Sequence, residues 1–203
     1  MEIARPAGIA VGAQDVAVHD DGPWTGEVTA PVLAAAEPLE HRLVTDARES
    51  AALWRIREDG AGLAARSLER QALSGWEDAA VPPERLGAWL RDSDELLEGH
   101  ELQGVPYGHF GDGCLHVRID FDLLTKPGVQ NFRDFMTAAA DLVVAHGGSL
   151  SGEHGDGQAR AELLPRMYPP QIISAFEDFK GIWDPDDRMN PGRVVRPATM
   201  DEN

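Results

Sequence analysis

The segment GHFGDGCLHVRIDFD, residues 108–122, decides the fold. In its second half the apolar residues alternate strictly with polar ones: Leu115, Val117, Ile119 and Phe121 against Cys114, His116, Arg118 and Asp120. This period of two is typical of a strand with one buried face. The Asp112-Gly113 pair that precedes it is a favoured two-residue turn. The sequence therefore predicts a β-hairpin with an apolar face on the core and a polar face left open.

A two-residue turn at Asp112-Gly113 predicts that His109 lies directly opposite His116. Opposed side chains have Cβ atoms roughly 4.5–5.5 Å apart, so these two histidines could share one metal ion. The same alternation places Tyr107 and Arg118 on the histidine face. A solvated hairpin whose outer face carries imidazoles accounts for this segment equally well, so a metal site needs further ligands.

Helical patterns flank the hairpin on both sides. Asp46, with Glu49 three residues later, resembles a capping box at the start of a helix over residues 47–58. Apolar residues at helical spacing predict further helices in residues 82–100, 131–146 and 171–184. HRLVT, residues 41–45, is expected to be a short strand. Helices set among antiparallel strands predict an α+β sandwich, with helices packed on one face of the sheet.

The domain organisation follows composition. Residues 1–40 are rich in Ala, Gly, Pro and acidic residues and have no sustained period, so we expect a poorly specified leader. The folded domain is expected over residues 41–197, with a tail at 198–203. A length of 203 residues suits one domain with an extension.

Charge and cysteine content exclude several classes of function. The formal net charge of −17 would repel a phosphate backbone, so nucleic acid is not an expected partner. An anionic small substrate remains possible where a local cation such as Arg57 or Arg118 binds it. With Cys114 as the single cysteine, no internal disulfide or cysteine-based metal cluster can form. The sequence has no transmembrane pattern or signal peptide, which predicts a cytoplasmic location.

A second glycine-rich segment, GGSLSGEHGDGQAR at residues 147–160, offers the missing ligands. Glu153 and His154 stand between glycines that let the backbone approach a ligand. If the segment is extended, the two side chains point opposite ways, so that one binds metal while the other faces a reactant. Two imidazoles and a carboxylate suit zinc or manganese. Asp156 is a rival carboxylate, and a glycine-rich turn with a salt-bridged Glu and an exposed His is the structural alternative.

Three motifs in order, GHFGDGCLH, SGEHGDG and MNPGRVV, resemble the C-terminal half of FAD-linked oxidases of the vanillyl-alcohol oxidase superfamily. The branch of D-lactate, glycolate and D-2-hydroxyglutarate dehydrogenases is the most similar, and the resemblance runs from about residue 40 to 195. It implies a ferredoxin-like α+β cap that closes over the ring of an FAD held mainly by an N-terminal domain, supplied in cis or in trans.

The resemblance also implies roles for individual residues. His109, His116 and Glu153 match metal ligands, and His154 matches a base beside the flavin. Arg57 matches an arginine that holds the substrate carboxylate, and Asn190 lies in a segment that returns toward the flavin domain. In the implied reaction, a divalent metal binds the hydroxyl and carboxylate of a small D-2-hydroxy acid, His154 takes the hydroxyl proton, and hydride passes to the flavin.

Two residues depart from the family pattern. Trp76 stands where a substrate-binding lysine is frequent, and Arg118 replaces a small polar residue, so that Arg118 becomes a candidate substrate contact. The segments WRIREDGAG and GWEDAAVPP resemble the corresponding segments of members that are fused to an iron–sulfur domain. Such a domain is therefore a possible further partner. Because the flavin domain is not in this sequence, the chain is expected to be a fragment or a subunit. The alternatives are a self-sufficient metallohydrolase and an inactive remnant of a split reading frame.

Overall fold

A computed structural model describes residue 44 and residues 46–202, except for the side chains of Arg57 and Ala61. The leader over residues 1–40 lies outside the described residues, and so does the expected strand at residues 41–45 apart from residue 44. The chain divides into two units, Met1–Gly60 and Ala61–Asn203. In the first unit, helix α2 (Ala47–Glu58) begins after Asp46, whose Oδ1 accepts hydrogen bonds from the N–H groups of Arg48 and Glu49 at 3.0 and 2.9 Å. This is the cap predicted from the sequence.

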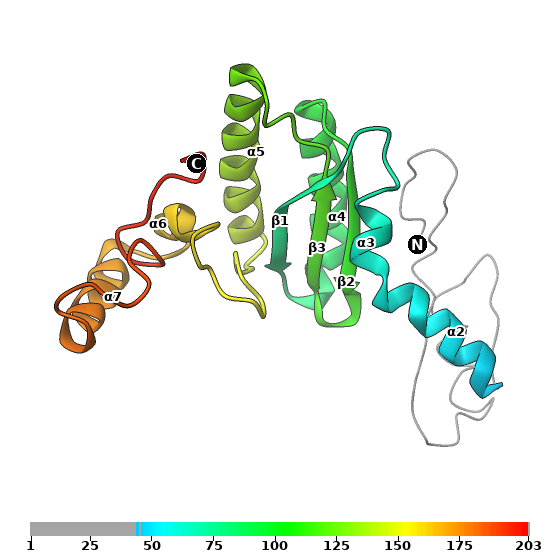
Figure 1. Cartoon of the computed structure of the whole chain (residues 1–203), viewed down its shortest axis with the longest axis horizontal. Coiled ribbons are helices and arrows are strands. Elements are labelled where there is room, and N and C mark those ends of the chain that lie inside the picture. The colour runs from blue at the N-terminus through cyan, green and yellow to red at the C-terminus, as the bar shows by residue number, and fades with distance from the viewer. Residues whose placement is uncertain (1–43, 45, 203) are drawn as a thin grey trace. The chain divides into compact units, whose positions relative to one another are not determined.

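The second unit is built on a three-stranded antiparallel sheet (Figure 1). Its strands are β1 (Leu73–Ala80), β2 (Gly104–His109) and β3 (Cys114–Ile119), in the order β1-β3-β2. After β3 and a helix, an isolated antiparallel bridge joins Ser149 to Ala80 on the free edge of β1. The order matches a ferredoxin-like sheet in which this bridge stands at the place of the fourth strand. The predicted α+β class is confirmed.

The hairpin forms, but the predicted register is wrong by two residues. His109 pairs with Cys114 and Tyr107 with His116. The loop is longer than two residues because Phe110–Asp112 forms a 3-10 turn and Gly113 follows it with φ 72°. A turn of this kind followed by a left-handed glycine is common in longer hairpin loops. Because a shift of two preserves the alternation, His109, Tyr107 and His116 still share one face.

Two long helices pack on the face of the sheet opposite His116 and form the hydrophobic core with it. The 3-10 turn η1 (Pro83–Arg85) leads into α4 (Leu86–Gly99), and Thr125 caps α5 (Lys126–Ala145) by accepting the N–H of Gly128. An apolar pocket between these helices and the sheet is lined by Trp76, Trp89, Val117, Ile119 and Phe135 among others. The alternation of β3 is thus used as predicted, with Val117 and Ile119 buried against the helices.

The remaining elements of the second unit are short, apart from the last helix. They are α3 (Gly60–Ala64), which begins at the last residue of the first unit, η3 (Ala161–Leu163), α6 (Leu164–Met167) and α7 (Pro170–Trp183). The predicted helix over 171–184 is confirmed. Phe176 on its apolar face packs against the Tyr168 ring, but Phe179 and Trp183 are 66% and 68% exposed. In the described part of the chain, no helix has the length and apolarity needed to cross a membrane.

Candidate active site

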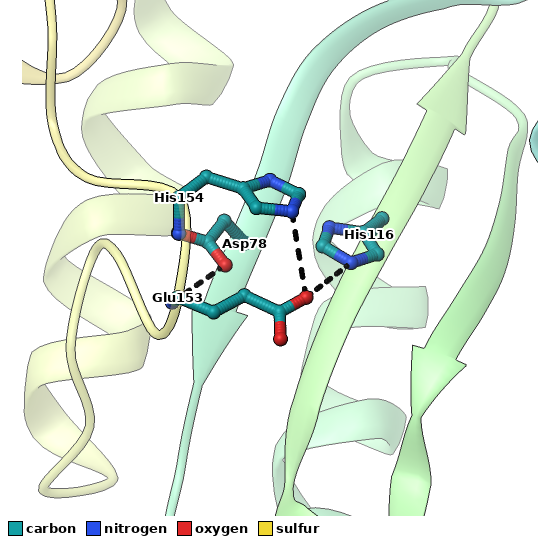
Figure 2. Close-up of side chains that lie close together, drawn as sticks. All are labelled: Asp78, His116, Glu153 and His154. Atoms are coloured by element: carbon teal, nitrogen blue, oxygen red, sulfur yellow. Dashed lines mark hydrogen bonds and ion pairs between the residues drawn. The ribbon is translucent and has the colours of Figure 1, made fainter.

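Three predicted site residues meet on the face of the sheet opposite α4 and α5 (Figure 2). His116 projects from β3, and its Nε2 lies 3.2 Å from Oε1 of Glu153. Nε2 of His154 lies 3.5 Å from the same oxygen, and the two imidazole rings are stacked with centroids 4.8 Å apart. Glu153 and His154 belong to the loop after α5. The structure therefore brings together two segments that are 37 residues apart in the chain.

Asp78 holds this loop against the sheet, a role that no sequence pattern predicted. Its carboxylate is fully buried and accepts hydrogen bonds from Ser151 Oγ at 2.5 Å and from the N–H groups of Glu153 and His154 at 2.9 and 2.7 Å. Burial acts to raise the pKa of Asp78, but these hydrogen bonds outweigh it and lower the pKa. Asp78 therefore stays ionised and fixes the backbone from which both functional side chains project.

The expectation that Glu153 and His154 point in opposite directions is wrong. Residues 151–154 do not form a strand but bend around Asp78, so both side chains reach the same side. Gly152 permits this bend, because a Cβ at that position would lie 2.7 Å from Cys114 Sγ and 2.9 Å from Ala80 Cβ. The loop is therefore packed closely against both β1 and β3.

The donor set fits a divalent metal ion. Ligand atoms of Asp78, His116, Glu153 and His154 all lie within 4.8 Å of one another. His109 is more distant, with its Nε2 3.8 Å from Oε2 of Glu153. Since the hydrogen bonds from the loop occupy the oxygens of Asp78, the donors that remain are imidazole nitrogens and the Glu153 carboxylate, which zinc and manganese accept.

A second charged group stands beside His116 on the same face. Arg118 Nη1 lies 2.9 Å from Oε1 of Glu77, and the guanidinium carbon lies 6.0 Å from the centre of the Tyr107 ring. The Tyr107 ring itself contacts His116, with centroids 5.2 Å apart. Trp76, by contrast, is buried in the pocket against α4 and adds nothing to this face.

The predicted roles of two further residues, Arg57 and Asn190, are not tested by contacts of the described residues. Arg57 lies in α2, in the first unit, and its side chain is outside the described residues. Asn190 is exposed in the segment after α7, with φ 50°, and its carbonyl accepts the N–H of Arg193. Their predicted roles as substrate and cofactor contacts remain predictions.

The structure also bears on Asp156 as a metal ligand and on Cys114 as a reactive thiol. Asp156 is not in the metal-binding group, and burial raises its pKa. Cys114 is buried beside Asp78, and burial followed by the Asp78 charge raises the pKa of its thiol to about 11. A thiol with this pKa is almost entirely protonated at neutral pH, so Cys114 is a poor nucleophile.

Arg160 is a second residue that the sequence analysis did not identify. It is buried, donates to the carbonyl of Glu77 at 2.6 Å and to that of Gly155 at 3.1 Å, and lies 3.9 Å from Asp78 Oδ2. It thus ties β1 to the loop and partly balances the buried Asp78 charge. The partners of Arg160 are backbone carbonyls, which no side-chain pattern in the sequence marks. The only signal for this role was its place in the turn-rich segment GEHGDGQAR.

Comparison with known proteins agrees with this geometry. Residues 27–194 match the family model of the C-terminal domain of FAD linked oxidases. The chain is 36% identical over 121 residues to D-2-hydroxyglutarate dehydrogenase of Haemophilus influenzae, covering 60% of this chain and 12% of the relative. It is 34% identical over 119 residues to D-lactate dehydrogenase of Archaeoglobus fulgidus, covering 59% of this chain and 26% of the relative.

A third relative extends the match. D-2-hydroxyglutarate dehydrogenase of Pseudomonas putida is 33% identical over 164 residues, which cover 80% of this chain and 16% of the relative. The chain thus spans between 12% and 26% of the length of these three relatives. Because the family model covers well over half of the chain, the chain belongs to the family of FAD-linked oxidase C-terminal domains.

Proposed function

We propose that this chain is the metal- and substrate-binding part of a flavin-dependent D-2-hydroxy-acid dehydrogenase of the D-lactate or glycolate type. The observation that carries the proposal is the convergence of His116, Glu153 and His154 at one point on the open face of the sheet. The names of two relatives, D-2-hydroxyglutarate dehydrogenase and D-lactate dehydrogenase, support the same class of substrate. FAD would be held mainly by a flavin-binding domain in cis or in trans, and an iron–sulfur domain is a possible further partner.

Different residues of the protein would bind the metal and accept the proton. His109, His116 and Glu153 would hold a divalent ion, zinc or manganese, which supplies Lewis-acid polarisation of the substrate hydroxyl while FAD supplies the hydride acceptor. His154 would accept the hydroxyl proton at Nε2, because its ring is half-exposed and stacked on His116. Asp78 holds the backbone of His154 in place through the 2.7 Å hydrogen bond.

Substrate and flavin contacts complete the proposal. Arg57 and Arg118 are proposed substrate-binding residues, and Asn190 and His154 are proposed to face the flavin. A single free cysteine and the acidic composition agree with a proposed cytoplasmic location. The domain bounds of 41–197 also stay a prediction, beside a family match over 27–194.

The test is anaerobic reduction of FAD by D-lactate or glycolate in the full chain combined with a flavin-binding domain. His154→Gln should retain the metal but slow reduction by about 100-fold or more, since a positioned base contributes roughly 10²–10⁴ in rate. His146→Gln is the matched control, because His146 pairs with Asp92 away from the cluster. Full activity of His154→Gln would refute the role of His154 as base.

A further inference from the structure

The Glu77–Arg118 ion pair lies immediately beside the candidate metal ligands. Arg118 is two residues from His116 on the same face of β3, a separation of roughly 6–7 Å along a strand. Glu77 comes from β1, and its Oε1 lies 2.9 Å from Arg118 Nη1. Tyr107, whose hydroxyl donates to the same oxygen at 3.5 Å, contacts both Arg118 and His116. A substrate extending from the metal along β3 would therefore meet these three side chains.

The charge of Arg118 is already compensated within the chain. The two side chains are 21% and 26% exposed, so the pair is accessible but partly shielded from water. A carboxylate that approached Arg118 would also approach Glu77, and the attraction and repulsion nearly cancel. Trp76, next to Glu77 in β1, is buried on the helix side of the sheet and supplies no further charge. A net charge of −17 disfavours a second negative charge still further.

We propose that the Glu77–Arg118 pair makes this site selective for 2-hydroxy acids with a single carboxylate and against those with a second carboxylate at the far end. The inference rests on the proposed function, because it assumes that the 2-hydroxy acid binds at the metal. The side chains of Glu77, Arg118 and Tyr107 together form a neutral polar wall, and Arg118 contacts the substrate as part of this wall. D-lactate has a single carboxylate and places no charge against this wall. D-2-hydroxyglutarate would place its second carboxylate there without a compensating positive charge.

The experiment compares three ligands by NMR titration of the full chain loaded with zinc. D-2-Hydroxyglutarate and its 5-amide share one carbon skeleton and differ in the distal charge, and D-lactate lacks the distal group. The wild-type chain should bind the amide and D-lactate about ten-fold more tightly than D-2-hydroxyglutarate, because the distal carboxylate would lose hydration without gaining a net attraction from the neutral Glu77–Arg118 pair. Preference of the wild-type chain for D-2-hydroxyglutarate over its amide would overturn the inference.

A double-mutant cycle separates charge compensation from a purely structural role. Glu77→Gln should bring the affinity for D-2-hydroxyglutarate level with that for the amide, and Arg118→Gln should widen the gap. The double variant should return to the wild-type ratio, because the wall is neutral again. Glu95→Gln, on the exposed surface of α4, is the matched control and should change nothing.

The outcomes distinguish this inference from the proposed function. If the zinc-loaded chain binds all three ligands but Glu77→Gln leaves their ratio unchanged, the selectivity role of the pair is wrong and the proposed function stands. If no zinc binds, or if none of the three hydroxy acids perturbs the zinc-loaded chain, the proposed function fails and the inference fails with it.

Discussion

At the scale of single residues, the site depends on a carboxylate that is not itself free to bind metal. Asp78 is buried with φ 77°, and its two oxygens are occupied by Ser151, Glu153 and His154. Outer-shell partners of this kind orient metal ligands and typically change metal affinity by 10–100-fold when lost. Asp78 is therefore a positioning residue for Glu153 and His154.

Replacing Asp78 by Asn tests this role. The amide has one acceptor oxygen instead of two, and its NH2 group would face N–H donors of the loop. Asp78→Asn should therefore destabilise the fold by about 2 kcal/mol. It should also weaken zinc binding at least about ten-fold. Because the pKa of Asp78 is below its ordinary 3.8, the stabilisation from its carboxylate is complete above pH 3.8 and is lost as pH falls through the lowered pKa. Urea unfolding of both proteins at several pH values measures this, and an equal difference at all pH values would contradict it.

Cys114 gives a second prediction at this scale. With its pKa raised to about 11, the thiol should react with a thiol-specific reagent far more slowly at pH 8 in the folded chain than in urea. The rate in the folded chain should continue to rise as pH approaches 11. Rapid labelling of the native protein at neutral pH would show that the thiol is neither buried nor deprived of its thiolate form.

At the scale of elements, the hairpin loop sets the position of His109. Gly113 has φ 72°, and a Cβ there would lie 2.0 Å from the carbonyl oxygen of Val81. Gly111, two residues earlier in the same loop, has no atom within 4 Å of its Cβ position. The two glycines thus form a matched pair in which one is required and the other is free.

Gly113→Ala should therefore destabilise the domain by about 2–3 kcal/mol through strain and steric overlap. Gly111→Ala should stay within about 0.5 kcal/mol of the wild type. Thermal or urea unfolding measures both. Equal stability of the two variants would mean that the loop has a different conformation.

The sequence predicted the elements with strong periods and missed those without one. The alternation in β3 and the helical spacing in α4, α5 and α7 were sufficient for those elements. β1 was missed because its pairing with β3 is irregular twice, between Ser74 and Trp76 and between Trp76 and Ala79, which destroys a period of two. The hairpin register was wrong because Gly113 closes a longer turn, which the Asp-Gly pair alone does not reveal.

The site was predictable only as far as single segments allow. His116, Glu153 and His154 were identified from motifs, and the structure brings them together. Asp78 and Arg160 were not identified, because their importance lies in contacts with backbone atoms distant in the chain. No local pattern marks such contacts.

At the scale of the whole molecule, a metal ion would link the sheet to the loop after α5. Binding to the folded state alone stabilises a protein by about 2.7 kcal/mol when the free ligand is at 100 times its Kd. Zinc should therefore raise the Tm of the wild-type chain by several degrees. Glu153→Gln should remove most of this increase, whereas a similar increase in the variant would place the ion elsewhere.

Metal binding by His116 and Glu153 is measured by the metal content of the purified full chain after equilibration with zinc or manganese and removal of the excess. We expect one ion per chain, with occupancy lost in His116→Ala and Glu153→Gln and retained in His146→Gln. A wild-type chain that holds no ion, or a double variant of His116 and Glu153 that keeps one, would show that these residues do not form a metal site.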